Sequence, residues 1–174
     1  MMMPTNKMAD IQLLLLDVDG VLTDGSVIYS DTGAEIKTFN VRDGLGLRLL
    51  MKAGVEVGII TGRQSDALLM RCRDLGIDLV FQGVKDKAKV FETILARTKI
   101  PAKYTAFMGD DLPDLSVYNS VGLFFTVSDA PFELLSRAHG TTTCKGGHGA
   151  VREVCENILK TKGVWEKTVQ GFLT

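Results

Sequence analysis

The sequence predicts an α/β fold built on a doubly wound, mainly parallel sheet of the Rossmann-like kind. Short apolar runs such as 13–16 are too short for full helices and lack the alternation of a half-buried strand, which is typical of parallel strands covered on both faces. Between these runs lie stretches with apolar residues at helical spacing, so strands and helices alternate along the chain. The 174 residues are enough for one domain with a substantial core. We therefore expect a single domain over 1–174.

The individual elements follow from apolar runs, helical spacing and the glycines and prolines that separate them. Buried strands are expected at 13–16, 55–60, 77–81, 104–108 and 121–127, and helices at 42–54, 65–75, 85–97, 112–118, 131–137 and 146–160. The spacing places Leu45 and Leu69 on inward helix faces. Two segments fall outside this pattern: a β-hairpin insertion at 26–41, with a turn at Ser30-Asp31-Thr32-Gly33, and a C-terminal tail at 163–174. Residues 1–10 are expected to be a frayed end.

Composition and charge exclude several classes of partner. The net charge of −1 gives no general attraction to nucleic acid or to an anionic membrane. No run approaches the roughly 18 apolar residues of a membrane span, and the N-terminal segment has no signal-peptide core. The three cysteines, Cys72, Cys144 and Cys155, form no CxxC motif, which favours a reducing, cytoplasmic setting.

Two carboxylates follow the first predicted strand directly. Asp17 and Asp19 stand at its carboxyl end with Gly20 behind them, and ligands of open α/β sheets bind at that edge. Two carboxylates so close together repel each other unless a cation lies between them, and Mg²⁺ prefers oxygen ligands of this kind. An Asp carboxylate can also be a covalent nucleophile in phosphoryl transfer. The alternative is a simple Asp-Gly turn after a strand.

Further polar residues follow the other predicted strands. They are Thr61, then Lys85 and Lys87, and then Asp110, Asp111 and Asp114. Because the carboxyl ends of parallel strands meet at one edge, these groups should cluster with Asp17 and Asp19 into a metal cage, a hydroxyl donor and an ammonium. That is the set needed for phosphoryl transfer. Polar residues at strand ends are common in α/β proteins, and this could explain any one of these strand ends. It explains poorly why all four strand ends carry groups that suit the same reaction.

The motifs DVDGVLTD, IITGR, a downstream lysine and GDDLPD, in this order, resemble the four motifs of the haloacid dehalogenase superfamily. The resemblance implies that Asp17 is the nucleophile that becomes an aspartyl-phosphate. It implies that Asp19 is the general acid/base, with its backbone carbonyl on the metal, as in the phosphatases of the superfamily. Thr61 matches the phosphate-binding hydroxyl and Lys87 the motif lysine. Asp110 matches the Mg²⁺ ligand, so the implied metal ligands are Asp17, Asp19 and Asp110, with Asp111 and Asp114 as supports.

A narrower resemblance is carried by NVRDGLG, GGHGAVREVCENIL and QGFL, which are similar to segments of 3-deoxy-D-manno-octulosonate 8-phosphate (KDO 8-phosphate) phosphatases. It implies Mg²⁺-dependent hydrolysis of an acidic sugar phosphate, no separate cap domain, and a site closed by the hairpin and by neighbouring subunits of a tetramer. His148 departs from the pattern, because a Lys or Arg is expected after the double glycine. The expected substrate-binding residues are Asp43, Gly62, Arg63 and Arg152; the two arginines could pair with a sugar carboxylate.

Three alternatives stay open at this point. The substrate could be a nonulosonate 9-phosphate, such as a sialic-acid precursor. The chain could be a non-catalytic relative that binds an acidic sugar, although the intact Asp17 and Asp19 argue against this. The Gly146-Gly147-His148-Gly149 turn could hold an anion at a helix N-terminus or merely cap that helix.

Overall fold

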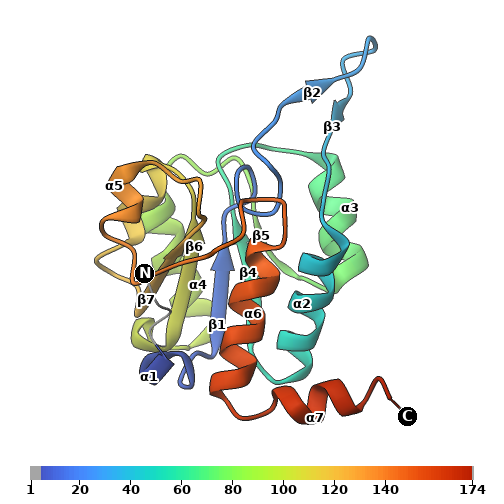
Figure 1. The fold of residues 1–174 in the computed structure, drawn as a ribbon. Helices are drawn as coiled ribbons and strands as arrows, with labels where there is room; N and C mark the ends of the chain where they lie inside the picture. The colour runs from blue at the N-terminus through green and yellow to red at the C-terminus, as the bar shows by residue number, and fades with distance from the viewer. Residues whose placement is uncertain (1–4, 174) are drawn as a thin grey trace.

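A computed structural model describes residues 5–173, and its centre is a six-stranded parallel sheet (Figure 1). The strand order is β5-β4-β1-β6-β7-β8, and every neighbouring pair is parallel. The strands are β1 (Leu13–Leu16), β4 (Glu56–Ile60), β5 (Leu79–Phe81), β6 (Thr105–Gly109), β7 (Leu123–Thr126) and β8 (Gly140–Thr141). The predicted α/β class and parallel sheet are therefore confirmed.

The sheet changes direction at β1, and this change positions the site. From β1 the chain builds outward to β4 and β5, then returns to β6 on the other side of β1 and continues to β7 and β8. Open α/β sheets bind ligands at such a switch point, beyond the carboxyl ends of the strands. All four residues of β1 are fully buried because it lies in the interior of the sheet between β4 and β6.

Helices cover both faces of the sheet, as right-handed βαβ connections require. On one side α2 packs against α6, and on the other α4 packs against the 3₁₀ helix η2. The helices that follow the first strand are α2 (Val41–Lys52), α3 (Asp66–Leu75), α4 (Lys87–Thr98), η1 (Ala102–Tyr104), η2 (Leu112–Val117), α5 (Phe132–Leu135), α6 (Ala150–Thr161) and α7 (Trp165–Gln170). None of the helices in residues 5–173 has the length and apolar character to cross a membrane.

Local signals set the ends of α3 much as the sequence predicts. The Ser65 side chain accepts a hydrogen bond from the Leu68 amide at 3.4 Å, and Gly76 ends the helix in the left-handed conformation with φ 78°. The inward placement predicted for Leu45 and Leu69 is wrong, since both are 39% exposed. In a short helix, one leucine next to the buried apolar face can fit the helical spacing and yet point to solvent. A single exposed leucine is common on protein surfaces.

Three short elements differ from the prediction. The expected frayed end is wrong for residues 5–8, which form α1 (Thr5–Met8) with Met8 fully buried in the core; residues 1–4 lie outside the described part. The segment 112–118 forms a 3₁₀ helix, with Pro113 in its first turn. β8 has only two residues, too few for a periodic signal.

The insertion forms a separate two-stranded hairpin, as predicted. Its strands, β2 (Ile28–Tyr29) and β3 (Glu35–Ile36), pair antiparallel. Figure 1 shows the hairpin projecting beyond the edge where β1 ends, while α7 lies at the opposite end of the sheet. The hairpin therefore stands over the predicted site of its own chain, whereas the tail lies away from it.

Candidate active site

A cleft of about 860 Å³ lies at the carboxyl edge of the sheet. The polar residues predicted from four strand ends meet in it: Asp17, Asp19, Thr61, Gly62, Arg63, Lys85, Lys87, Asp110, Asp111 and Asp114 all line its wall. They are brought together because β1, β4, β5 and β6 are adjacent parallel strands that end at the same edge. Asp43 and Arg152, predicted to contact substrate, do not line this cleft.

Asp17 follows β1 directly and faces a buried lysine. Lys87, the first residue of α4, is 6% exposed, and its ammonium lies 3.1 Å from Asp17 Oδ2 and 2.5 Å from Asp114 Oδ1. Burial opposes the charged form of Lys87, but the two carboxylates outweigh it and raise the lysine pKa. The ammonium is therefore a fixed positive charge beside the Asp17 carboxylate.

Asp17, Asp110 and Asp114 form an acidic cluster with carboxylate oxygens within 4.8 Å of one another. Burial, then the charge of Asp114, raises the pKa of Asp17 to about 6. Burial, then the charge of Asp17, raises the pKa of Asp110 to about 8. Within the described residues, Asp17 Oδ1 and Asp110 Oδ1 are buried with no hydrogen-bond partner. Buried carboxylates that lie this close together call for a hard cation between them, so the donor set fits Mg²⁺.

Asp114 belongs to this cluster but has its oxygens occupied. Its Oδ2 accepts hydrogen bonds from the Asp110 and Asp111 amides at 3.0 and 3.3 Å, and its Oδ1 receives Lys87. Asp114 and Asp111 also form the capping box of η2. These hydrogen bonds fix the main chain at Asp110, and the supporting role of Asp111 and Asp114 at a metal stays a prediction.

Glycines allow the loop after β1 to approach this cluster. Gly20 has φ +84°, and a Cβ there would lie 2.0 Å from Asp110 Oδ2. Behind it, a Cβ on Gly146 would lie 1.8 Å from the Gly20 carbonyl oxygen, and the Gly147 amide donates to Val21 O at 2.9 Å. Of the two interpretations of the glycine turn, these contacts favour a packing and capping role, since Gly149 is the N-cap of α6.

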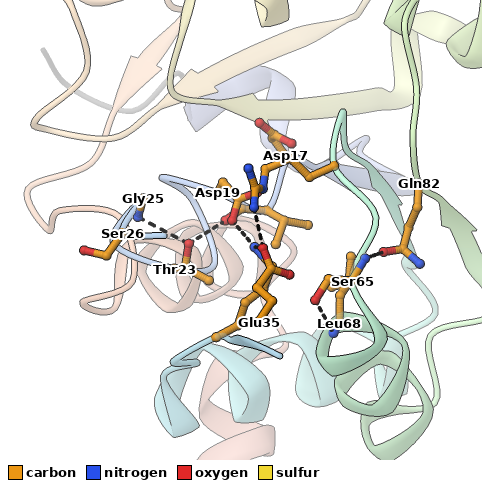
Figure 2. A network of polar contacts seen from close by, with 12 residues as sticks. Asp17, Asp19, Thr23, Gly25, Ser26, Glu35, Ser65, Leu68 and Gln82 are labelled. Atoms are coloured by element: carbon orange, nitrogen blue, oxygen red, sulfur yellow. Dashed lines mark hydrogen bonds and ion pairs between the residues drawn. The ribbon is translucent and has the colours of Figure 1, made fainter. Parts of the chain in front are cut away.

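The carboxylate of Asp19 points away from the acidic cluster. It forms ion pairs with Lys37 of the hairpin and, at 3.4 Å, with Arg63 Nε. Figure 2 shows the Asp17 carboxylate turned away from the group of contacts that joins Asp19 to Glu35. With its side chain so engaged, Asp19 would have to serve the metal through its backbone carbonyl, which is the role the family resemblance implies.

Thr61 is placed at the end of β4 by main-chain hydrogen bonds to the β5 side. Its amide donates to Phe81 O and its carbonyl accepts from the Val84 amide, both at 3.0 Å. The residue is 2% exposed, and its neighbour Gly62 has open space beside it, since only Val84 O would lie within 4 Å of a Cβ added there. A hydroxyl and a free main-chain surface at this point suit a phosphate group.

Asp43 and Arg152 are used elsewhere in this chain. Asp43 is 1% exposed, and its Oδ1 accepts a hydrogen bond from the Arg152 amide at 2.6 Å in the first turn of α6. The Arg152 guanidinium pairs with Glu156 at 2.7 Å and lies over the Trp165 ring. In a single chain both residues hold α6 in place, so their substrate contacts stay predictions.

Lys37 and Glu35 contact the predicted site residues but were not predicted from the sequence to do so. Only 3% of the Lys37 side chain is exposed, and its ammonium lies 3.7 Å from Glu35 Oε1 as well as against Asp19. Glu35 also receives the Arg63 guanidinium at 2.5 Å. A lysine in a polar hairpin resembles surface charge, and a contact across 18 residues leaves no periodic trace.

No protein-family model matches the chain. It is 46% identical to the 3-deoxy-D-manno-octulosonate 8-phosphate phosphatase of Yersinia pestis over 153 residues, which are 88% of this chain and 82% of that protein. The Moraxella catarrhalis phosphatase of the same name, solved with magnesium, phosphate and KDO, is 39% identical with a TM-score of 0.94 over 97% of both chains. The cobalt-bound enzyme of Haemophilus influenzae is 39% identical with a TM-score of 0.92 over 97% of this chain and 99% of that one.

These relatives match the fold and most of the length of the chain. The chain therefore belongs to the family of 3-deoxy-D-manno-octulosonate 8-phosphate phosphatases within the haloacid dehalogenase superfamily.

Proposed function

We propose that this chain is a Mg²⁺-dependent phosphatase that hydrolyses KDO 8-phosphate to KDO and phosphate. The observation that carries the proposal is the buried cluster of Asp17, Asp110 and Lys87, in which a carboxylate with one unpartnered oxygen lies 3.1 Å from an ammonium. The 46% identity to a KDO 8-phosphate phosphatase supports the substrate.

The reaction proceeds in two steps at phosphorus. The Asp17 carboxylate attacks the phosphorus atom, the bond from phosphorus to the sugar oxygen breaks, and Asp19 gives that oxygen a proton. Asp19 then takes a proton from water, the water oxygen attacks the aspartyl-phosphate, and phosphate leaves with the Asp17 carboxylate restored. Lys87 and Thr61 hold the phosphoryl oxygens and balance the charge that develops on them.

Asp17, Asp110 and the main-chain carbonyl of Asp19 would hold the Mg²⁺. When bound, the ion supplies electrostatic neutralisation of the phosphoryl oxygens and relieves the repulsion between the two carboxylates. The buried, unpartnered oxygens of Asp17 and Asp110 support this assignment.

Substrate selection would take place at the outer part of the cleft. Arg63 lies there with 41% of its side chain exposed, and a planar guanidinium suits a sugar carboxylate. Gly62 lies beside it and leaves room for the substrate. A nonulosonate 9-phosphate carries the same two charged groups, so it is the competing substrate.

A neighbouring subunit would complete the cover of the cleft. The hairpin exposes four apolar side chains, Val27, Ile28, Tyr29 and Ile36, at 44–61%. Exposed apolar patches of this kind mark association surfaces, which supports the tetramer implied by the family resemblance. The tail lies far from its own cleft, so any contribution from it, or from Asp43 and Arg152, would be made to a neighbour's site.

The unpaired Cys72, Cys144 and Cys155 support a cytoplasmic location.

A phosphate-release assay over a panel of sugar phosphates tests the function. With Mg²⁺ present, KDO 8-phosphate should give the highest kcat/KM, and chelation of the metal should remove the activity. A higher kcat/KM for a nonulosonate 9-phosphate would assign the alternative substrate. No release from any member of the panel by the folded, Mg²⁺-supplied protein would contradict the proposal and favour a non-catalytic sugar-binding role.

A further inference from the structure

The Asp19 carboxylate is held between two cations that come from different parts of the chain. Lys37 follows β3 of the hairpin and contacts one carboxylate oxygen, while Arg63 follows β4 and lies 3.4 Å from the other. Within residues 5–173 no other side chain binds this carboxylate. The direction in which Asp19 points is therefore set by Lys37 and Arg63 together.

The two cations differ in how free they are. The Arg63 side chain is 41% exposed and lines the cleft, where an incoming anion can reach it. The Lys37 side chain is 3% exposed and does not line the cleft. A substrate anion that engages Arg63 would weaken its contact with Asp19, whereas the contact with Lys37 would persist.

Glu35 ties this arrangement to the hairpin. Its Oε1 lies 2.5 Å from the Arg63 guanidinium and 3.7 Å from the Lys37 ammonium, and the Tyr29 hydroxyl oxygen accepts from Arg63 at 3.3 Å. Two carboxylates and two cations thus form a closed set that joins the hairpin to the loops after β1 and β4. Lys37 is the buried member of this set, and a buried charge needs a partner, which Asp19 and Glu35 provide.

From these contacts we propose that Lys37 is a positioning residue, which holds the Asp19 carboxylate in place for proton transfer to and from the sugar oxygen. The inference rests on the proposed function, because it assigns Lys37 a part in the same reaction. Lys37 itself does not touch the phosphoryl group; it acts through Asp19. The hairpin thereby contributes to the chemistry as well as to the cover of the cleft.

The test uses two substrates that differ in their need for a proton. The sugar oxygen of KDO 8-phosphate is a poor leaving group and needs protonation, whereas p-nitrophenolate leaves without it. The comparison uses kcat/KM, which reports the first step alone, because hydrolysis of the aspartyl-phosphate is common to both substrates and also needs Asp19. General acid–base catalysis is worth about 10²–10⁴-fold, so Lys37→Met should lower kcat/KM for the sugar phosphate by about 10-fold or more. The same variant should lower kcat/KM for p-nitrophenyl phosphate far less. Lys37→Arg, which keeps the charge, should restore most of the sugar-phosphate kcat/KM.

A double variant separates positioning from a purely structural effect. If Lys37 acts through Asp19, Asp19→Asn combined with Lys37→Met should hydrolyse the sugar phosphate as slowly as Asp19→Asn alone. Lys89→Met, at an exposed lysine of α4, is the matched charge control and should leave both activities unchanged. Equal losses of kcat/KM on both substrates in Lys37→Met, or a further loss in the double variant, would overturn the inference. Wild-type turnover of the two substrates tests the proposed function separately.

Discussion

At the scale of single residues, the site depends on charges that burial brings unusually close. Asp17, the proposed nucleophile, has one oxygen facing Lys87 and another with no hydrogen-bond partner within the described residues. An asparagine keeps the shape but loses the anionic oxygen that would attack phosphorus.

We therefore expect Asp17→Asn to lower kcat by about 10³-fold or more while the thermal unfolding temperature changes little. Removal of one of two mutually repelling carboxylates offsets the loss of the pair with Lys87. Phosphate release by protein purified away from contaminating phosphatases, together with circular dichroism, gives the answer. Turnover near that of the wild type would show that another group is the nucleophile.

Asp110 should matter mainly through the metal. Asp110→Ala removes one of the two unpartnered buried oxygens, so we expect weaker Mg²⁺ binding and a fall in activity that excess Mg²⁺ partly restores. Titration of activity against Mg²⁺ measures both effects. Asp78→Ala is the matched control, since this aspartate is exposed and does not line the cleft. An unchanged Mg²⁺ requirement in Asp110→Ala would remove this residue from the metal site.

The raised carboxyl pKa values predict a link between pH and metal binding. In the metal-free protein the pKa of Asp17 is about 6 and that of Asp110 about 8, both above the unfolded value of 3.8, so folding takes up protons. Protonation of the two carboxyls therefore favours the folded state. This contribution to the free energy of unfolding is complete below pH 3.8 and is lost as pH rises through 6 and 8. Mg²⁺ displaces those protons, so its affinity should increase between pH 6 and pH 8.

Isothermal titration calorimetry in two buffers of different ionisation enthalpy would count the protons that Mg²⁺ releases. The increase in melting temperature caused by Mg²⁺ should also be larger at the upper end of this pH range. An affinity that does not vary with pH would contradict the assigned ligands.

At the scale of elements, the loop after β1 and the glycine turn before α6 act as one packed unit. A Cβ on Gly146 would lie 1.8 Å from the Gly20 carbonyl oxygen, and a Cβ on Gly20 would meet Asp110. The catalytic loop is thus held from behind by a segment that is distant in sequence.

Gly146→Ala should displace this loop and weaken the protein. Overpacking of this kind costs about 1–3 kcal/mol, which urea denaturation resolves as a lower midpoint. Mg²⁺ affinity should fall with it, because Gly20 approaches Asp110 directly. Gly171→Ala is the matched control, since the nearest atom to its Cβ is 3.4 Å away. An unchanged midpoint in Gly146→Ala would show that the turn adapts without strain.

The strands could be predicted from local sequence, whereas the long-range side-chain contacts could not. β1 and β6 were predictable because an uninterrupted apolar run is itself the signal of a buried parallel strand, and their ends then locate Asp17 and Asp110. The contacts of Lys37 and Asp43 were not predictable, because each joins positions 18 or 109 residues apart through a single side chain. Such contacts are decided by packing in three dimensions and leave no pattern along the chain.

At the scale of the whole molecule, the chemistry lies at one end of the sheet and α7 at the other (Figure 1). The cleft lies at the carboxyl edge of the sheet, and the hairpin at that edge presents apolar residues to solvent. We expect the active form to be an oligomer in which neighbouring hairpins meet.

The combined variant Val27→Ser and Ile28→Ser should shift the protein toward monomer in multi-angle light scattering and lower kcat/KM. Water enters an uncovered site and weakens its electrostatic interactions. Phe132→Ser, at a residue 76% exposed on α5, is the control for loss of surface apolar area and should leave the assembly unchanged. A fully active monomeric wild type would rule out the requirement for a neighbour.

The separation between the buried cluster and the exposed Arg63 has a consequence for how such enzymes diversify. Asp17, Lys87 and Asp110 are supplied by the ends of interior strands and by α4, and each takes part in the proposed phosphoryl transfer, so changes there remove the activity. Arg63 and the hairpin are exposed, and substitutions at exposed positions cost little stability. Descendants of this chain can therefore acquire new sugar preferences by exchanging a few outer residues while they inherit the phosphoryl-transfer machinery intact.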